Sequence, residues 1–163
     1  MISGKVNIRS YLFESGFALI EILVVLSIIV LLIVVSYSSL INSNKNQALA
    51  NDVAKAVSFL DRARSLTLDS QNASQYGVHL EQDSLTLFKG SSFSSTDPSN
   101  FTESLNKSVT ISSYSLNDGG ADVVFERLTG KTEGYGTVTF SLVSDNTKYK
   151  VITISNTGLV EQN

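Results

Sequence analysis

Residues 16–35 decide the fold of this chain, and they read GFALIEILVVLSIIVLLIVV. After Gly16 the run of about 19 residues holds only two polar side chains, those of Glu21 and Ser27. At ~1.5 Å per helical residue the run is roughly 30 Å long, which is the thickness of the hydrocarbon core of a bilayer. A chain of 163 residues is too short to surround such a helix with a soluble core. We therefore expect residues 17–41 to form a transmembrane helix.

Glu21 needs an explanation of its own, because a charge inside an apolar span costs at least ~2.5 kcal/mol. The sequence has no basic residue within a helical turn or two of it. Cleavage between Gly16 and Phe17 would create an α-amine four residues before Glu21, and positions i and i+4 share a helix face. An amine and a carboxylate would then lie on one side of the helix, at one end of the apolar run.

Residues 16–26 (GFALIEILVVL) resemble the type III signal of type IV pilins and type II secretion pseudopilins. In that family a membrane-embedded aspartyl peptidase cuts after the glycine and then N-methylates the new N-terminal residue, usually phenylalanine. The glutamate five residues into the mature chain guides each subunit into a helical filament. The resemblance therefore implies cleavage after Gly16, N-methylation of Phe17 and an assembly role for Glu21. Two features depart from the family: Ala18 stands where threonine is commoner, and the helix-softening glycine and proline found later in many pilins are missing.

The resemblance makes residues 1–16 a leader peptide. Lys5 and Arg9 precede the apolar span, and positive charge at that place holds the N-terminus in the cytoplasm. We expect a single-pass protein of the cytoplasmic membrane whose remaining chain lies outside, and which then enters a surface or periplasmic filament. Two alternatives remain open: a standard secretory signal cut near residues 36–39, and an uncleaved signal anchor.

Composition limits the classes of function. Two of the 12 basic and two of the 15 acidic residues precede Asn42, so the rest of the chain keeps the net charge of −3, which argues against a nucleic-acid surface. The lack of cysteine excludes disulfides, thiolate metal sites and a cysteine nucleophile. The single histidine, His79, excludes a histidine-rich metal site, and we expect it to have no chemical role. The sequence has no nucleophile elbow, metal-ligand spacing or phosphate loop, so neither an enzyme nor a cofactor is expected.

The chain continues as a helix beyond the apolar run, because no glycine or proline occurs in residues 17–70. In residues 42–70 the apolar side chains follow a helical spacing, and this stripe predicts an amphipathic helix that packs on its own domain. The stripe consists of Leu49, Val53, Ala56, Leu60 and Ala63. One helix over residues 17–70 would be roughly 80 Å long.

Residues 71–163 change to a period of two, which predicts a small head domain of antiparallel β-sheet. The expected strands are 75–81, 84–89, 108–116, 122–128, 136–144 and 148–155. A long surface loop is expected over residues 90–107, which are rich in serine, threonine and asparagine. The predicted fold class is α+β: a long N-terminal helix, transmembrane in its first half, packed on an antiparallel β head.

Three further stretches resemble the GspH/FimT family of minor pilin-like proteins. They are FLDRARS at 59–65, VFERLTG at 124–130 and VITISNTGLV at 151–160. Members of that family share a long N-terminal helix under a small head of antiparallel sheets. Some belong to type II secretion pseudopili, others prime type IV pili, and one group binds DNA through C-terminal arginines. Residues 158–163 (GLVEQN) contain no arginine and depart from that last group.

The resemblance implies a structural subunit, a minor pilin or pseudopilin of a type IV pilus-like or type II secretion filament. Its partners would be other pilin or pseudopilin subunits, the prepilin peptidase/methyltransferase, an inner-membrane platform protein and membrane lipid. The alternative is a DNA-binding minor pilin for DNA uptake, although the negative charge speaks against a nucleic-acid partner. That alternative would gain support if Arg127, Lys131, Lys148 and Lys150 clustered across neighbouring strands.

Overall fold

The computed structural model describes residues 9–69 and 73–162, with the side chains of residues 9–18 and 35–42 left out. The chain divides into two compact units, Met1–Ser43 and Asn44–Asn163. Residues 1–8 of the predicted leader, and several side chains of the predicted transmembrane segment 17–41, lie outside the described residues. In the described part of the chain, no helix is both long and apolar enough to cross a membrane.

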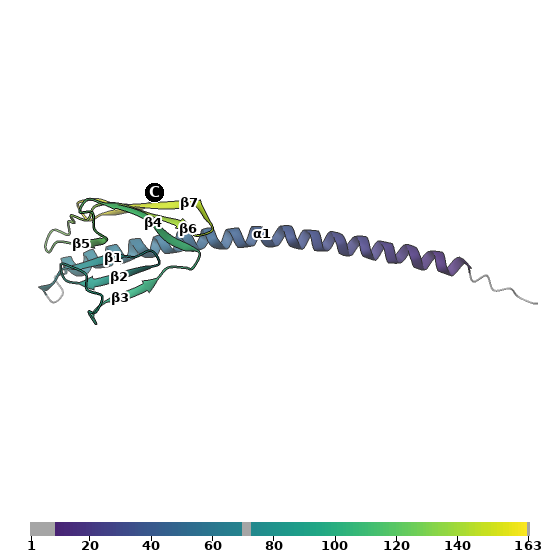
Figure 1. Cartoon of the computed structure of the whole chain (residues 1–163), viewed down its shortest axis with the longest axis horizontal. Helices are drawn as coiled ribbons and strands as arrows, with labels where there is room; N and C mark the ends of the chain where they lie inside the picture. Colours follow the sequence, from purple (N-terminus) through teal and green to yellow (C-terminus); the bar gives the residue numbers. More distant parts are fainter. Residues whose placement is uncertain (1–8, 70–72, 163) are drawn as a thin grey trace, which may run out of the picture. The chain divides into compact units, whose positions relative to one another are not determined.

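A single helix, α1 (Arg9–Leu68), contributes to both units and is drawn from purple to teal in Figure 1. As predicted, residues 17–68 are helical, and the helix begins at Arg9, before the predicted start at residue 17. In the first unit the apolar side chains described in residues 19–34 are exposed. Even Ile29, the most covered of them, is 46% exposed.

In the second unit the predicted stripe of α1 is buried. The side chains of Leu49, Val53, Ala56, Leu60 and Ala63 are at most 4% exposed and belong to one core with side chains of both sheets. Burial of this stripe removes the apolar face of an amphipathic helix from water, which is the main stabilising contribution to such a helix in a folded domain. The predicted packing of residues 42–70 on the head is therefore confirmed.

The strands described in the second unit form two antiparallel four-stranded sheets (Figure 1). The first sheet has the order β3-β2-β1-β5, with β1 (Tyr76–Leu80), β2 (Ser84–Lys89), β3 (Phe101–Ser104) and β5 (Asp122–Val124). The second has the order β4-β6-β7-β8, with β4 (Val109–Leu116), β6 (Gly136–Leu142), β7 (Asp145–Ile154) and β8 (Val160–Gln162). The predicted α+β class, a helix packed on an antiparallel β head, is confirmed.

Three details of the predicted strands are wrong. The expected loop 90–107 contains β3, because Phe101 stacks on Phe59 of α1 at 5.8 Å between ring centroids and its strand pairs with β2. The expected strand 122–128 ends at Val124, because the amide of Gly130 bonds to the carbonyl of Glu126 and closes a turn there. The expected strands also leave out β8, which pairs with the end of β7.

Asp52 joins α1 to the segment that follows β3. Asp52 is only 3% exposed. Its carboxylate accepts the amide hydrogen of Asn106 at 2.7 Å and lies 3.4 Å from the Lys55 ammonium. Lys55 also lies 3.0 Å from Glu103, and this hydrogen bond is the main cause of the raised pKa of Lys55. A raised lysine pKa stabilises the fold below the ordinary value of 10.5 and loses that contribution as the pH rises through the folded-state pKa. The ammonium of Lys55 is therefore charged at neutral pH, and the contribution of its ion pairs is present there.

Replacing Asp52 by alanine should lower the free energy of unfolding by about 2 kcal/mol, because the Asn106 amide and Lys55 lose a buried acceptor. Asp61→Ala is the matched control, since Asp61 is an exposed carboxylate on the same helix. Thermal unfolding of the two variants measures the difference. Equal shifts of Tm for both would contradict the role assigned to Asp52.

Candidate functional site on the N-terminal helix

The predicted processing residues, Gly16 and Phe17, lie within α1. Their side chains are outside the described residues, so cleavage after Gly16 and methylation of Phe17 stay predictions. Glu21 follows one helical turn after Phe17. It is the predicted site residue whose side chain the structure describes.

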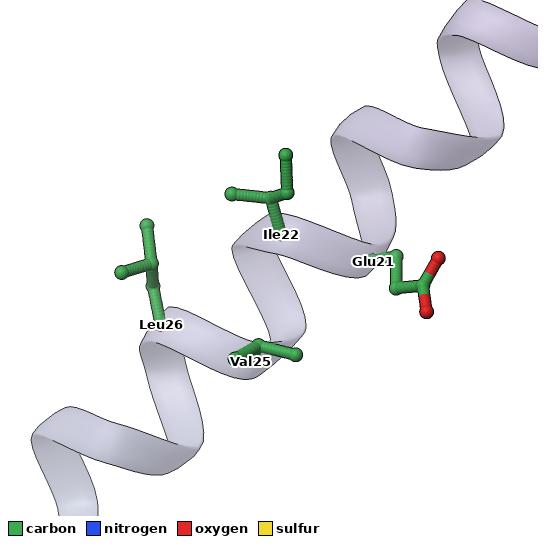
Figure 2. A pocket seen from close by; sticks show the side chains of 4 residues that line it. All are labelled: Glu21, Ile22, Val25 and Leu26. Atoms are coloured by element: carbon green, nitrogen blue, oxygen red, sulfur yellow. The ribbon is translucent and has the colours of Figure 1, made fainter.

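Glu21 lies on an exposed, otherwise apolar helix surface. With Ile22, Val25 and Leu26 it lines a shallow depression of about 410 Å³ (Figure 2). In Figure 2 the Glu21 carboxylate projects away from the helix, while Ile22 and Leu26 project together from another side. Positions 22 and 26 are four residues apart and therefore share a face. The surface thus combines a shallow apolar depression with a single carboxylate, an arrangement suited to binding a second apolar helix.

Ser27, the other polar residue of the run, has its partner inside the helix. Its hydroxyl donates to the carbonyl oxygen of Leu23 at 2.7 Å, the i−4 bond by which serine satisfies itself in a helix. Glu21 differs, because within the described residues no basic side chain forms an ion pair with it. The carboxylate is the group of this stretch that needs a partner from elsewhere.

The four basic residues considered for DNA binding are not brought together. Lys148 and Lys150 lie near the middle of β7. Arg127 and Lys131 lie in the segment that follows β5. This segment contacts the chain just beyond the C-terminal end of β7, where the Thr132 amide donates to the Asn156 carbonyl oxygen. Lys150 is four residues, or about 13 Å, from the end of β7. The geometry therefore does not support a basic patch built from these four side chains.

The surroundings of His79 could not be predicted from the sequence. Its Nδ1 lies 2.5 Å from Asp122 Oδ1, and its ring stacks on Phe93 at 3.9 Å between centroids. The register of β1 and β5 places His79 opposite Asp122, although 43 residues separate them in the chain. Long-range strand pairing of this kind leaves no local signal in the sequence. Among the described residues, no group of three His, Cys, Asp or Glu side chains could hold a metal ion.

The three stretches that resemble the GspH/FimT family, 59–65, 124–130 and 151–160, meet near the end of α1. We call this contact the Arg64 site, and it consists of Arg64, Gly130 and Gly158. Arg64 Nε donates to the carbonyl oxygen of Gly130 at 3.3 Å. Gly130 and Gly158 have φ values of 64° and 79°, in the left-handed region that glycine adopts without strain. A Cβ at Gly158 would lie 2.0 Å from the Gly130 oxygen, so the two turns are in direct contact. The motif residues therefore hold the head together at this point.

Comparison with known proteins supports the fold. No protein-family model matches the sequence, and no curated protein matches it by sequence. Two crystal structures of the type IV minor pilin FimU of Pseudomonas aeruginosa (strain PAO1), in space groups P65 and P21, are similar, each with a TM-score of 0.51 and 17% identity. Each match covers 71% of this chain, and 92% or 87% of the FimU chain. With its helix packed on antiparallel sheets, this chain has the fold of a type IV pilin.

Proposed function

We propose that this chain is a structural filament subunit, a minor pilin or pseudopilin of a type IV pilus-like or type II secretion filament. It is made as a prepilin, cut after Gly16 and N-methylated at Phe17 by the prepilin peptidase/methyltransferase. Before assembly, residues 17–41 anchor it in the cytoplasmic membrane with the head outside. The observation that carries the proposal is Glu21, an ionisable side chain on an exposed apolar helix in a chain with a pilin fold.

The exposed apolar surface of α1 has to be covered by something. Each apolar side chain described in residues 19–34 is at least 46% exposed, and a continuous surface of this kind is unfavourable in water. Lipid covers it in the membrane, and the helices of neighbouring subunits cover it in a filament. The partners of the proposal follow from this: membrane lipid, other pilin or pseudopilin subunits, and the inner-membrane platform protein that transfers subunits between the two environments.

The charge of Glu21 sets the register between subunits. Cleavage after Gly16 frees the α-amine of Phe17, and the amine of one subunit pairs with the Glu21 carboxylate of the next. In surroundings of low dielectric constant an unpaired charge is strongly unfavourable, so the subunit enters the filament where both charges are paired. The alternative, a DNA-binding minor pilin for DNA uptake, has less support, because Arg127 and Lys131 lie apart from Lys148 and Lys150.

Replacing Glu21 by alanine should reduce incorporation into filaments while membrane insertion and cleavage stay intact or improve. The loss of one partner leaves the other charge uncompensated, which costs ~3–5 kcal/mol. Glu21→Asp should give an intermediate result, because its shorter side chain reaches less far. The measurement is the amount of subunit in sheared filaments relative to the membrane pool.

Ser27→Ala is the matched control for this experiment, since its hydroxyl is already bonded within the helix and its loss removes no contact between subunits. Incorporation of Glu21→Ala equal to that of wild type and Ser27→Ala would contradict the pairing role for a subunit within the filament. A subunit at the tip has no subunit ahead of it. Antibody labelling of sheared filaments identifies that case by its position.

A further inference from the structure

The first sheet has a second face, outside the main core, that carries aromatic side chains. Leu85 and Leu87 of β2 point into the main core, whereas Phe88 is 1% exposed without belonging to that core. Phe93, from the loop of residues 90–100, packs against Phe88 edge to face at 5.7 Å between ring centroids. A Cβ at Gly77 would lie 2.6 Å from the Phe88 ring, so Phe88 lies directly over the backbone of β1. The loop therefore covers this face through Phe93.

His79 lies beside this aromatic cluster and links it to β5. The His79 ring is nearly parallel to that of Phe93, with 7° between the planes. Both carboxylate oxygens of Asp122 take part in hydrogen bonds. Its Oδ1 lies 2.5 Å from His79 Nδ1, and its Oδ2 accepts the amide hydrogen of Phe93 at 3.4 Å. The Asp122 carboxylate thus links His79 to the backbone of the loop, and the stacking of the His79 ring on Phe93 is a second link between them.

Within the described part of the chain, the charged groups in contact with His79 are acidic. Asp122 faces it from β5, and Glu81, just after β1, places Oε1 at 3.7 Å from His79 Nε2. On β2 the residue opposite His79 is Thr86, which carries no charge. Asp97, the charged residue of the loop, interacts with Lys89, and hydrogen bonds from Ser99 hold its pKa below the ordinary value. A proton on His79 would therefore place a positive charge between two carboxylates.

We propose that His79, Asp122 and Phe93 form a pH-sensitive latch that holds the loop of residues 90–100 on the outer face of the first sheet. Imidazole is the side chain whose charge ordinarily changes between about pH 5 and pH 8, so a proton taken up by His79 in acid adds a positive charge to the latch. Its contribution is present in acid and is lost as the pH rises, because a neutral imidazole keeps the hydrogen bond to Asp122 but not the charge. Loosening of the loop uncovers Phe88 and Phe93. The head thereby gains an aromatic surface that depends on pH.

Hydrogen exchange of the full chain in detergent micelles tests the latch at about pH 5.5 and about pH 8, on either side of histidine titration. The quantity compared is the protection of peptides covering residues 90–100, after division by the intrinsic exchange rate at each pH. We expect protection roughly three- to ten-fold higher in acid, since charge-assisted hydrogen bonds are about twice as strong as neutral ones. His79→Phe keeps a ring against Phe93 but cannot take a proton, so the difference should vanish. Asp122→Asn should reduce it.

Three results would overturn the latch. The first is equal protection of the wild-type loop at both pH values. The second is the same pH dependence in His79→Phe. The third is a parallel change in peptides from β4 and β6 of the other sheet, which would mean that the whole domain responds.

A second measurement needs no variant. His79 is the single histidine of the chain, so its imidazole gives one unambiguous NMR titration. The Phe93 amide should shift with the same midpoint as the imidazole. A different midpoint, or no shift, would show that the loop does not sense this proton.

Discussion

Replacing Gly16 by leucine is expected to leave the precursor almost entirely uncut. The resemblance of residues 16–26 to a prepilin signal places the peptidase cut after Gly16. A glycine at that position leaves room for the backbone to approach the catalytic residues, and a side chain there would crowd the peptidase cleft. The effect is large because it acts on the transition state of cleavage, in which the scissile bond itself must be positioned.

Mass spectrometry of the N-terminus measures this result. The wild-type protein should begin at Phe17 and carry one N-methyl group, whereas Gly16→Leu should keep the leader. Gly4→Leu is the control, since it adds the same side chain to the leader away from the cut. A wild-type terminus within residues 36–39 would instead indicate a standard secretory signal, and a retained leader in wild type would indicate an uncleaved anchor.

The helix could be predicted because its signals are local. Residues 17–70 contain no helix breaker, and the stripe from Leu49 to Ala63 has helical spacing, so one helix with a buried second half follows directly. The strand pattern was equally clear where apolar residues alternate, as in Val138 and Phe140, both fully buried in β6. In each case the residue period alone decides which face is covered.

The short strands could not be predicted in the same way. β3 and β8 have four and three residues with one apolar side chain each, too few to show an alternating pattern, and each forms a strand because a partner strand lies beside it. β3 also depends on the contact of Phe101 with Phe59 and with the guanidinium of Arg62, which lies 5.5 Å from the ring centroid. Contacts between residues about 40 positions apart are properties of the tertiary fold.

The candidate functional residues also divide into one that the sequence reveals and one that only the folded structure reveals. Glu21 could be found from the sequence, because an acid within an apolar run is conspicuous and its energetic cost requires a reason. The structure added that Ser27 is satisfied within the helix, which singles out the carboxylate. His79 could not be found, since its environment depends on a strand and a loop that reach it only in the folded head. Alternation of residues gives the face on which a side chain lies, but not what covers that face.

Replacing Gly158 by alanine is expected to destabilise the second unit by at least about 3 kcal/mol, a large share of the stability of a small domain. The left-handed φ of 79° is one cost, because an L-residue with a Cβ pays for that conformation. The larger cost is steric. The new Cβ would lie 2.0 Å from the carbonyl oxygen of Gly130 and 3.0 Å from Arg64 Nε, so the two turns must separate. Their separation breaks the hydrogen bond from Arg64 to Gly130 and strains that from Thr132 to Asn156.

Gly119→Ala separates the two costs. Gly119 has a similar φ of 70°, but no atom lies within 4 Å of the position a Cβ would take. This variant should therefore lose only about 1 kcal/mol, the backbone part of the effect. Thermal unfolding of the full chain, followed by near-ultraviolet circular dichroism of its tyrosines, compares the two variants. If both lower Tm equally, the contact between the two turns contributes nothing, and the Arg64 site does not hold the head together.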